Sequence, residues 1–376
     1  MKPEKMIRLS KSCIGDAEKQ AVMGVLDREF LGMGAEVQQF EQALTEFFGR
    51  PTVCVVNGTA ALQLALQACG IGSGDEVLVQ SLTYVASFQA ISAAGATPVA
   101  CDIDPATLTL DWRDAEKRLT PKTKAVMPVH YSGGVGALDE IYAFAKKHAL
   151  RVIEDAAHAF GSVYKDKRVG GFGDIACFSF DGIKNITSGE GGCIVTNDQE
   201  VLRKVQDARL LGVEKDSEKR YTGQRSWEFD VSAQGWRYHM SNIMAAIGIE
   251  QLKRFPAMAS KRQCLARRYD ELLKPSSNIE VLPHNYALVV PHIYTVRIAS
   301  SESRERLIAK LNEFGVSSGI HYQPNHLLSL YRKSSIMDLH STRETYRRLL
   351  TLPLHPDLKQ GDVEFVSEKL ISLMAA

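Results

Sequence analysis

The sequence predicts an α/β protein: a three-layer sandwich around a mostly parallel seven-stranded sheet, followed by a smaller C-terminal α+β domain. Two observations predict the sandwich. Short apolar runs rich in valine and isoleucine recur along the first two-thirds of the chain, as expected of strands buried on both faces. Segments with helical periodicity separate these runs, and such alternation is typical of parallel sheets covered by helices. A third observation predicts the second domain: the regular alternation of apolar runs and helical patterns ends near residue 255.

The apolar runs are the first elements that follow from this pattern. We expect strands at Val53–Val56, Glu76–Gln80, Pro98–Asp102, Ala125–Val129, Arg151–Asp155, Ile175–Phe180 and Gly192–Thr196. The helical patterns between them include Thr59–Cys69, Leu138–His148 and Glu200–Leu211. The order of the strands within the sheet does not follow from the sequence.

The last third of the chain has a different pattern of expected elements. Pro256 interrupts a helical pattern, so we expect a large domain over residues 1–254 and a small domain over residues 255–376. The small domain is expected to contain a charged helix, a β-like run and a further helix, at Ser260–Leu273, His292–Ile298 and Ser303–Phe314.

The composition disfavours several classes of protein. The 45 basic side chains balance 44 acidic ones, and a formal net charge of +1 gives no sign of nucleic-acid binding. The seven cysteines show no paired short spacing, so neither a zinc site nor a disulfide framework is indicated. The N-terminal residues have no apolar run of signal-peptide length, and no stretch is apolar enough to span a membrane. We therefore expect a cytoplasmic enzyme without a metal site.

Small residues follow the first expected strand, where a helix begins. In the segment Asn57–Leu62, Gly58, Thr59 and Ala60 would let backbone N–H groups approach an anion, and the Thr59 hydroxyl could also donate. The alternative is an ordinary strand–helix turn in which Thr59 caps the helix. Taken alone, the segment favours this alternative.

An acidic residue ends the fifth expected strand. Carboxylates are rarely buried without a partner, so Asp155 is expected to cap a backbone group or to bind a cation. His158 follows three residues later and falls on the same side if a helical turn begins there. The alternative is an N-capping aspartate beside a surface histidine.

A lone lysine lies in the turn after the sixth expected strand. Lys184 follows Ser179 and precedes a glycine-rich hairpin, and burial in such a turn would lower its pKa and free a nucleophilic amine. Most lysines are solvated, which is the alternative. Lys184, Asp155 and an upstream anion site together are what pyridoxal phosphate (PLP) needs: an imine-forming amine, a partner for the pyridinium nitrogen and a place for the phosphate. Tyr84, after the second expected strand, could stack on the ring, although alone it would be a core or edge tyrosine.

With these segments in place, the sequence resembles the nucleotide-sugar aminotransferases of the DegT/StrS type, within the aspartate-aminotransferase superfamily. The likeness covers nearly the whole chain in the expected order. The segments that carry it are Asn57–Leu62, Glu154–His158, Ser179–Phe180, Lys184–Asn185, Gly189–Gly192, Gly235–Asn242, Gly319–Tyr322 and Leu352–Pro356.

The resemblance implies roles for particular residues. Lys184 would be the covalent anchor of the cofactor, and Asp155 would keep the pyridine nitrogen protonated. His158 would approach the phenolic oxygen of the cofactor. The phosphate would be bound near Gly58 by Thr59, Ala60 and Ser179, Tyr84 would stack on the ring, and the segment with His321 and Tyr322 would contact the substrate.

The resemblance also implies a homodimer whose active sites are completed by the partner subunit. Arg237 would then reach the phosphate bound in the other subunit. Many relatives carry asparagine at the position of Arg237, but a guanidinium can also hold a phosphate.

The implied reaction moves an amino group from a donor, most often L-glutamate, to a nucleotide-linked keto-sugar, as in polysaccharide or glycoside synthesis such as that of the lipopolysaccharide O-antigen. The stretch from His321 to His326 resembles relatives that aminate C-4 of a 4-keto-6-deoxyhexose more than those that aminate C-3. Three alternatives stay open: a pyridoxamine-dependent sugar dehydratase, whose lysine would be replaced by histidine; an enzyme acting only on amino acids; and a non-catalytic protein on the same fold. The sugar and the nucleotide stay undetermined.

Overall fold

The seven predicted strands form one sheet, and the α/β sandwich is confirmed. The computed structural model describes residues 6–299, 304–332 and 338–375. The strand order is β1-β9-β8-β5-β4-β2-β3, and every neighbouring pair is parallel except the two that β9 makes with β1 and β8. The strands are β1 (Thr52–Val55), β2 (Glu76–Gln80), β3 (Thr97–Cys101), β4 (Thr123–Met127), β5 (Arg151–Asp155), β8 (Ile175–Ser179) and β9 (Gly192–Thr196). A two-stranded hairpin, β6 (Val163–Tyr164) and β7 (Lys167–Arg168), lies outside this sheet.

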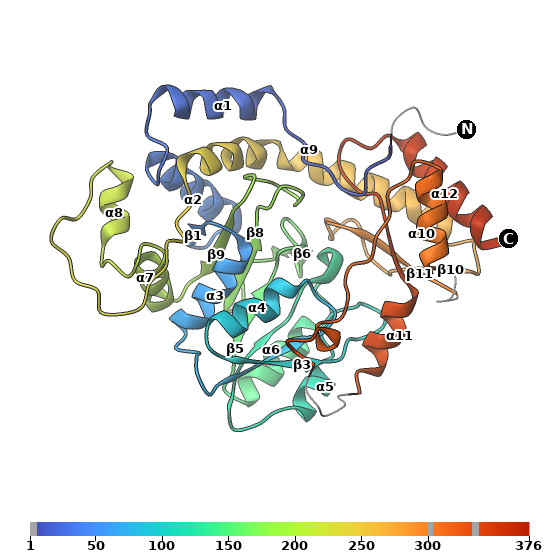
Figure 1. Ribbon diagram of the computed structural model, residues 1–376, viewed down its shortest axis with the longest axis horizontal. Helices are drawn as coiled ribbons and strands as arrows, with labels where there is room; N and C mark the ends of the chain where they lie inside the picture. The colour runs from blue at the N-terminus through green and yellow to red at the C-terminus, as the bar shows by residue number, and fades with distance from the viewer. Residues whose placement is uncertain (1–5, 300–303, 333–337, 376) are drawn as a thin grey trace.

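Alternate residues of these strands face two different helical layers, which makes the sandwich (Figure 1). On one face the strands pack against α3 (Gly58–Ala68), α4 (Val85–Ala93) and α7 (Gln199–Ala208). On the other face they pack against α2 (Ala35–Phe48), α5 (Trp112–Lys117), α6 (Leu138–Lys147) and the first half of α9 (Asn242–Leu273). A strand buried on both faces needs apolar residues at every position, which explains why the strands read as continuous apolar runs. Helix α1 (Asp16–Asp27) packs on α9.

The expected break at Pro256 is wrong, because α9 runs through it without interruption. A proline inside a helix costs about 3 kcal/mol, since it removes one backbone hydrogen bond and crowds the preceding turn. Packing on both sides offsets this cost. Phe255 and Met258 are buried in the core of the large sheet, whereas Leu265 and Tyr269 are buried in the core of the small sheet. The helix therefore connects the two cores (Figure 1).

The small unit is an α+β assembly around an antiparallel sheet, in the order β10 (Ile279–Val281), β11 (Tyr294–Ile298) and β12 (Leu349–Leu352). Helices α10 (Arg304–Glu313) and α12 (Gln360–Ala375) complete its core, and α11 (His340–Arg348) precedes β12. Ser303, the first residue of the predicted helix Ser303–Phe314, lies outside the described residues. Ile7 pairs with Val316, so the beginning of the described chain also joins this unit.

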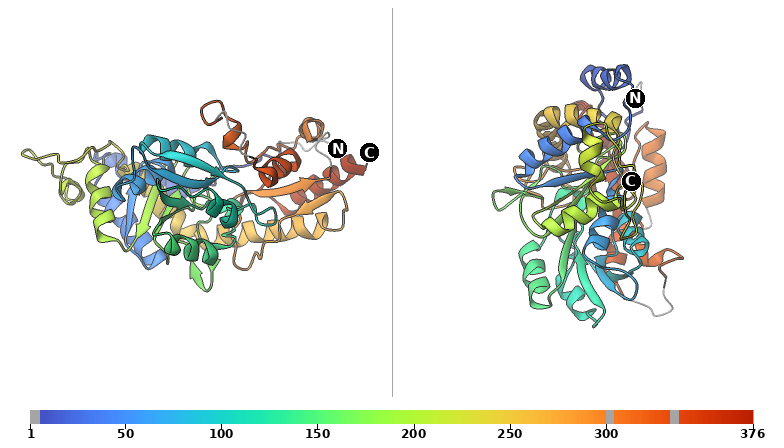
Figure 2. Two further views of the ribbon diagram at one scale, coloured as in Figure 1. Left: turned by 90° about the horizontal axis from the view of Figure 1, so that it is seen from below. Right: turned by 90° about the vertical axis from the view of Figure 1, so that its left-hand side faces the viewer.

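The two ends of the molecule carry different elements. Helix α12 lies at the end with the small sheet, and α8 (Asp216–Tyr221) lies at the opposite end, where the chain around it projects from the large sheet (Figure 2). Among the helices that the structure describes, none combines the length and the apolar character needed to cross a membrane.

Candidate active site

The predicted site residues come together at the edge of the sheet where the parallel strands end. The segments after β1, β2, β5 and β8 surround a cavity of about 440 Å³, and segments of the small unit close it. Its lining includes most of the residues predicted for the site: Gly58, Thr59, Tyr84, Asp155, His158, Ser179, Lys184, His321 and Tyr322. This is the edge at which doubly wound sheets bind ligands.

The start of α3 forms one wall of the cavity and is arranged for an anion. The helix is capped by Asn57 and not by Thr59, because Asn57 Oδ1 accepts a hydrogen bond of 2.8 Å from the N–H of Ala60. Within the described part of the chain, the N–H groups of Gly58 and Thr59 have no acceptor. A Cβ atom on Gly58 would lie 2.8 Å from Ser179 Cβ, so only glycine allows this close approach. Free N–H groups at a helix start attract an anion such as a phosphate.

Asp155 is the last residue of β5, and its carboxylate is held in place by two donors. Ser87 Oγ donates to Oδ2 over 2.7 Å, and the N–H of Ala157 donates to Oδ1 over 3.2 Å. The residue is 6% exposed. A buried carboxylate that no lysine or arginine of the described residues pairs with is poised to pair with a cation that enters the cavity.

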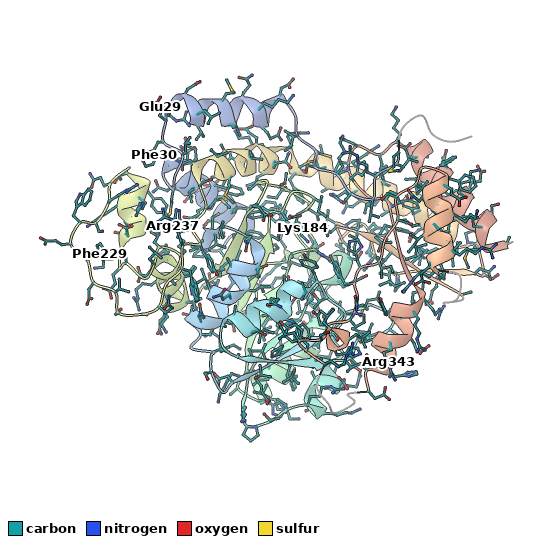
Figure 3. The ribbon with its side chains drawn as sticks, in the orientation of Figure 1. Glu29, Phe30, Lys184, Phe229, Arg237 and Arg343 are labelled. Atoms are coloured by element: carbon teal, nitrogen blue, oxygen red, sulfur yellow. The ribbon has the colours of Figure 1, made fainter. Side chains whose placement is uncertain are left out.

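Lys184 lies in the loop between β8 and β9, and its side chain reaches the cavity (Figure 3). Its amine is 3.4 Å from Nε2 of His292. Burial lowers the pKa of Lys184 to about 8, and the nearby carboxylates of Asp155 and Asp181 oppose this shift. A large fraction of the amine is therefore neutral, and hence nucleophilic, slightly above neutral pH.

Two further imidazoles, those of His158 and His321, line the same cavity. His158 Nε2 lies 3.0 Å from the hydroxyl of Tyr322, and Ser132 donates its N–H to His158 Nδ1 over 3.4 Å, which assigns the ring proton to Nε2. His321 Nδ1 is 3.0 Å from Thr351 Oγ1. Burial, with the charge of Lys184 as a second cause, holds the pKa of His158 well below its ordinary value and lowers the pKa of His321 to about 4. Both rings are therefore neutral at physiological pH.

Tyr84 stands at the mouth of the cavity as the residue before α4, and 59% of its surface is exposed. Its ring centroid is 5.5 Å from that of Tyr322. An exposed aromatic ring beside a cavity offers a face on which a flat ligand can stack.

The structure does not bring two of the predicted residues to this cavity. Ala60 lies within α3 and donates its N–H to Asn57. Arg237 is exposed and pairs through its backbone with Leu210; it lines a separate surface hollow with Phe30 and His239 (Figure 3). A contact between Arg237 and this cavity would have to come from a second subunit.

Two residues of the site escaped the sequence prediction. His292 follows Pro291 just before β11, and a histidine at the start of a buried strand was the only trace of it in the sequence. Ser87 lies in an apolar helix and looks like a helix residue with no special role until the fold places it against Asp155.

The residues present suit PLP as a ligand. They provide a lysine amine of lowered pKa, a buried carboxylate without a cation, free N–H groups beside a glycine and an exposed aromatic face, all around one cavity. These match the aldehyde, the pyridine nitrogen, the phosphate and the ring of that cofactor.

Known proteins match the chain over nearly its full length. The model of the DegT/DnrJ/EryC1/StrS aminotransferase family matches residues 12–371. The spore coat polysaccharide biosynthesis protein SpsC of Bacillus subtilis (strain 168) is 37% identical over 364 residues, which cover 94% of each chain.

Two solved structures share the fold over nearly the full length. Spr1654 from Streptococcus pneumoniae superposes in its PMP-form with a TM-score of 0.92 and 31% identity, over 98% of each chain, and it has also been solved in a PLP-form. The sugar aminotransferase CalS13 from Micromonospora echinospora superposes with a TM-score of 0.88 and 27% identity, over 98% of this chain and 100% of that chain.

The fold and its site are thus those of a PLP-dependent transaminase. The chain belongs to the DegT/DnrJ/EryC1/StrS aminotransferase family, as the resemblance of its motifs indicated. It is an enzyme of the sugar aminotransferase type.

Proposed function

We propose that this enzyme transfers an amino group from L-glutamate to a nucleotide-linked 4-keto-6-deoxyhexose, for the synthesis of a cell-surface polysaccharide or glycoside. The observation that carries the proposal is that a lysine amine of lowered pKa and a buried carboxylate line the same cavity. The kinship with SpsC, a polysaccharide biosynthesis protein, supports the polysaccharide context. The stretch from His321 to His326 supports amination at C-4.

The residues would divide the work as follows. PLP supplies, when bound, a ring that withdraws electrons from the carbon bearing the transferred nitrogen. The carboxylate of Asp155 would hold the positive charge on the ring nitrogen. The amine of Lys184, once free, would move a proton between the donor carbon and the cofactor in the first half of the cycle, and between the cofactor and the sugar carbon in the second, which is general acid–base work.

The remaining predicted residues would bind and orient. The phosphate would lie against the N–H groups of Gly58 and Thr59, near Ala60 and Ser179. Tyr84 would stack on the ring, and His158 would face its phenolic oxygen. His321 and Tyr322, which the small unit contributes, would contact the sugar.

A panel of nucleotide-linked keto-sugars, offered with glutamate, tests the reaction. We expect the highest kcat/KM with a 4-keto-6-deoxyhexose and an equimolar release of 2-oxoglutarate. Preference for a 3-keto-sugar would move the site of amination to C-3. Release of water from the sugar without uptake of nitrogen would contradict the proposal and indicate a dehydratase.

We further propose that the enzyme is a homodimer in which Arg237 contacts the phosphate in the partner's cavity, and that each subunit divides into a large unit of residues 1–254 and a small unit of residues 255–376. Two features support the dimer. Arg237 is exposed and remote from its own cavity lining. Large apolar side chains are exposed in the same part of the chain, with Trp227 at 87% and Phe229 at 59%, and exposed apolar side chains suit an interface between copies of the chain. Phe229 and Arg237 are labelled in Figure 3.

Mixing two weakened variants tests the contribution in trans. A dimer of one Lys184→Ala subunit and one Arg237→Ala subunit would carry both lesions in one active site and leave the other intact. We therefore expect activity to reappear on mixing, at about half of the wild-type value per heterodimer. Turnover measured before and after subunit exchange gives the result.

Two controls accompany this experiment. Arg225→Ala removes a neighbouring arginine of the same surface hollow. Mixed with Lys184→Ala, it should give no more than the average activity of the two parents. Exchange itself is followed with subunits carrying different affinity tags. If exchange occurs and activity stays at the average of the two parents, Arg237 does not act across the interface.

A further inference from the structure

A buried arginine lies behind the lysine site without a carboxylate partner. Arg262, in the middle of α9, is 2% exposed. Its Nη1 donates to the carbonyl oxygen of His292 over 3.1 Å and to that of Leu354 over 3.3 Å, and its Nε has no acceptor. No salt bridge of this guanidinium exists within the described residues. Buried charges are normally paired, so this exception calls for a physical reason.

One of the two carbonyl groups belongs to a residue that lines the cavity, and the other belongs to a segment next to a strand that contacts a lining residue. His292 itself lines the cavity, with Nε2 3.4 Å from the Lys184 amine and its ring centroid 4.5 Å from that of His158. Leu354 follows β12, the strand whose Thr351 contacts the His321 ring. One guanidinium thus joins α9 to His292, which lines the cavity, and to the segment that follows β12.

We propose that Arg262 is a positioning residue for Lys184: it fixes the backbone that holds His292 against the amine, and it places an uncompensated positive charge behind that imidazole. The proposal rests on the function proposed above for Lys184. Burial keeps the His292 ring neutral by holding its pKa well below the ordinary value. An amine that donates one N–H to His292 Nε2 has its lone pair directed away from the ring.

The charge of Arg262 acts on the protonation of the amine. The charges that act on Lys184 are those of the Asp155 and Asp181 carboxylates and of the Arg262 guanidinium. Other titratable groups lie around the same cavity: the carboxyl group of Glu190 and the neutral imidazoles of His158, His292 and His321. The carboxylates favour the protonated amine, whereas the guanidinium disfavours it. Burial lowers the pKa of Arg262 to about 10, so its charge persists at neutral pH. Without that charge only burial would oppose the carboxylates, and the pKa of Lys184 would rise.

Trace labelling with acetic anhydride measures this effect on the full-length protein freed of cofactor. The reagent reacts only with neutral amines, and peptide mapping gives the rate at Lys184 as a function of pH. We expect a midpoint near pH 8 for the wild type. Arg262→Gln keeps amide donors for the carbonyl groups and removes the charge. Its midpoint should rise by about one unit, which slows labelling at pH 7 about tenfold and leaves the rate at high pH unchanged.

Matched variants separate charge from folding. Arg262→Lys keeps the charge and should keep the midpoint near that of the wild type. Arg209→Met removes another fully buried arginine, the partner of Glu41, and should lower the thermal stability without moving the midpoint. An unchanged midpoint in Arg262→Gln, or an equal shift in Arg209→Met, would overturn the inference. Borohydride labelling of a lysine other than Lys184 would instead contradict the function proposed for Lys184, so the two failures are distinguishable.

Discussion

Replacing Lys184 by alanine is expected to lower kcat about a thousandfold or more. A positioned acid–base group typically contributes a factor of about 10² to 10⁴, and here the same side chain is also the proposed covalent anchor. The amine is suited to both tasks because burial lowers its pKa to about 8. Turnover with glutamate and an accepted keto-sugar measures the loss. Borohydride reduction of the wild type followed by peptide mapping should place the cofactor on Lys184.

The control for this substitution is a lysine of the same protein in a different environment. Lys253 is exposed on α9 and paired with Glu250. Lys253→Ala should leave kcat unchanged, since surface ion pairs contribute little. Turnover of Lys184→Ala close to the wild-type value would exclude the lysine from the chemistry.

The second large effect is expected for Asp155→Asn, which should lower kcat roughly a hundredfold or more. Losing the charge partner of a buried cation costs several kcal/mol, and an asparagine cannot keep the ring nitrogen protonated. The substitution preserves the shape of the side chain. The amide oxygen can still accept the hydrogen bond from Ala157 N–H, and the amide NH2 can donate to the Ser87 hydroxyl. The fold should therefore persist. Circular dichroism checks the fold, and steady-state kinetics measure the loss.

Asp174→Asn is the matched control. Asp174 also accepts hydrogen bonds, from Arg151, but it lies outside the cavity lining. We expect reduced stability and an unchanged kcat. Near-wild-type turnover in Asp155→Asn would show that some other group supports the cofactor ring.

The sequence alone predicted the sheet because strands buried on both faces need apolar residues at every position. This requirement is local, so the apolar runs predicted the ends of each strand to within about two residues. The runs at Glu76–Gln80, Arg151–Asp155 and Gly192–Thr196 agree with the structure at both ends. Asp155 and Lys184 were predicted for a related reason. A charged residue at the end of a buried strand, or in the turn that follows one, departs from its apolar surroundings, and the departure is visible in the sequence.

Predictions from local patterns were wrong where other contacts of the folded chain decide the structure. Pro256 predicts a helix end, yet the cores on either side stabilise α9 by more than the proline costs. Thr59 was a plausible cap, yet the side chain of Asn57 performs that role. Both errors concern a residue whose intrinsic preference is smaller than the energy of the contacts around it.

The tertiary structure alone decided which distant residues surround the predicted ones. Ser87 lies 68 residues from the carboxylate of Asp155 that it holds, and His292 lies 108 residues from Lys184. The Arg262 guanidinium reaches a carbonyl group 92 residues away. No period or spacing in a sequence encodes such contacts, because they arise only when the strand order and the path of α9 bring separate segments together. Residue types at strand ends therefore predicted the chemistry of the site, whereas the environment that lowers the pKa of Lys184 is a property of the folded chain.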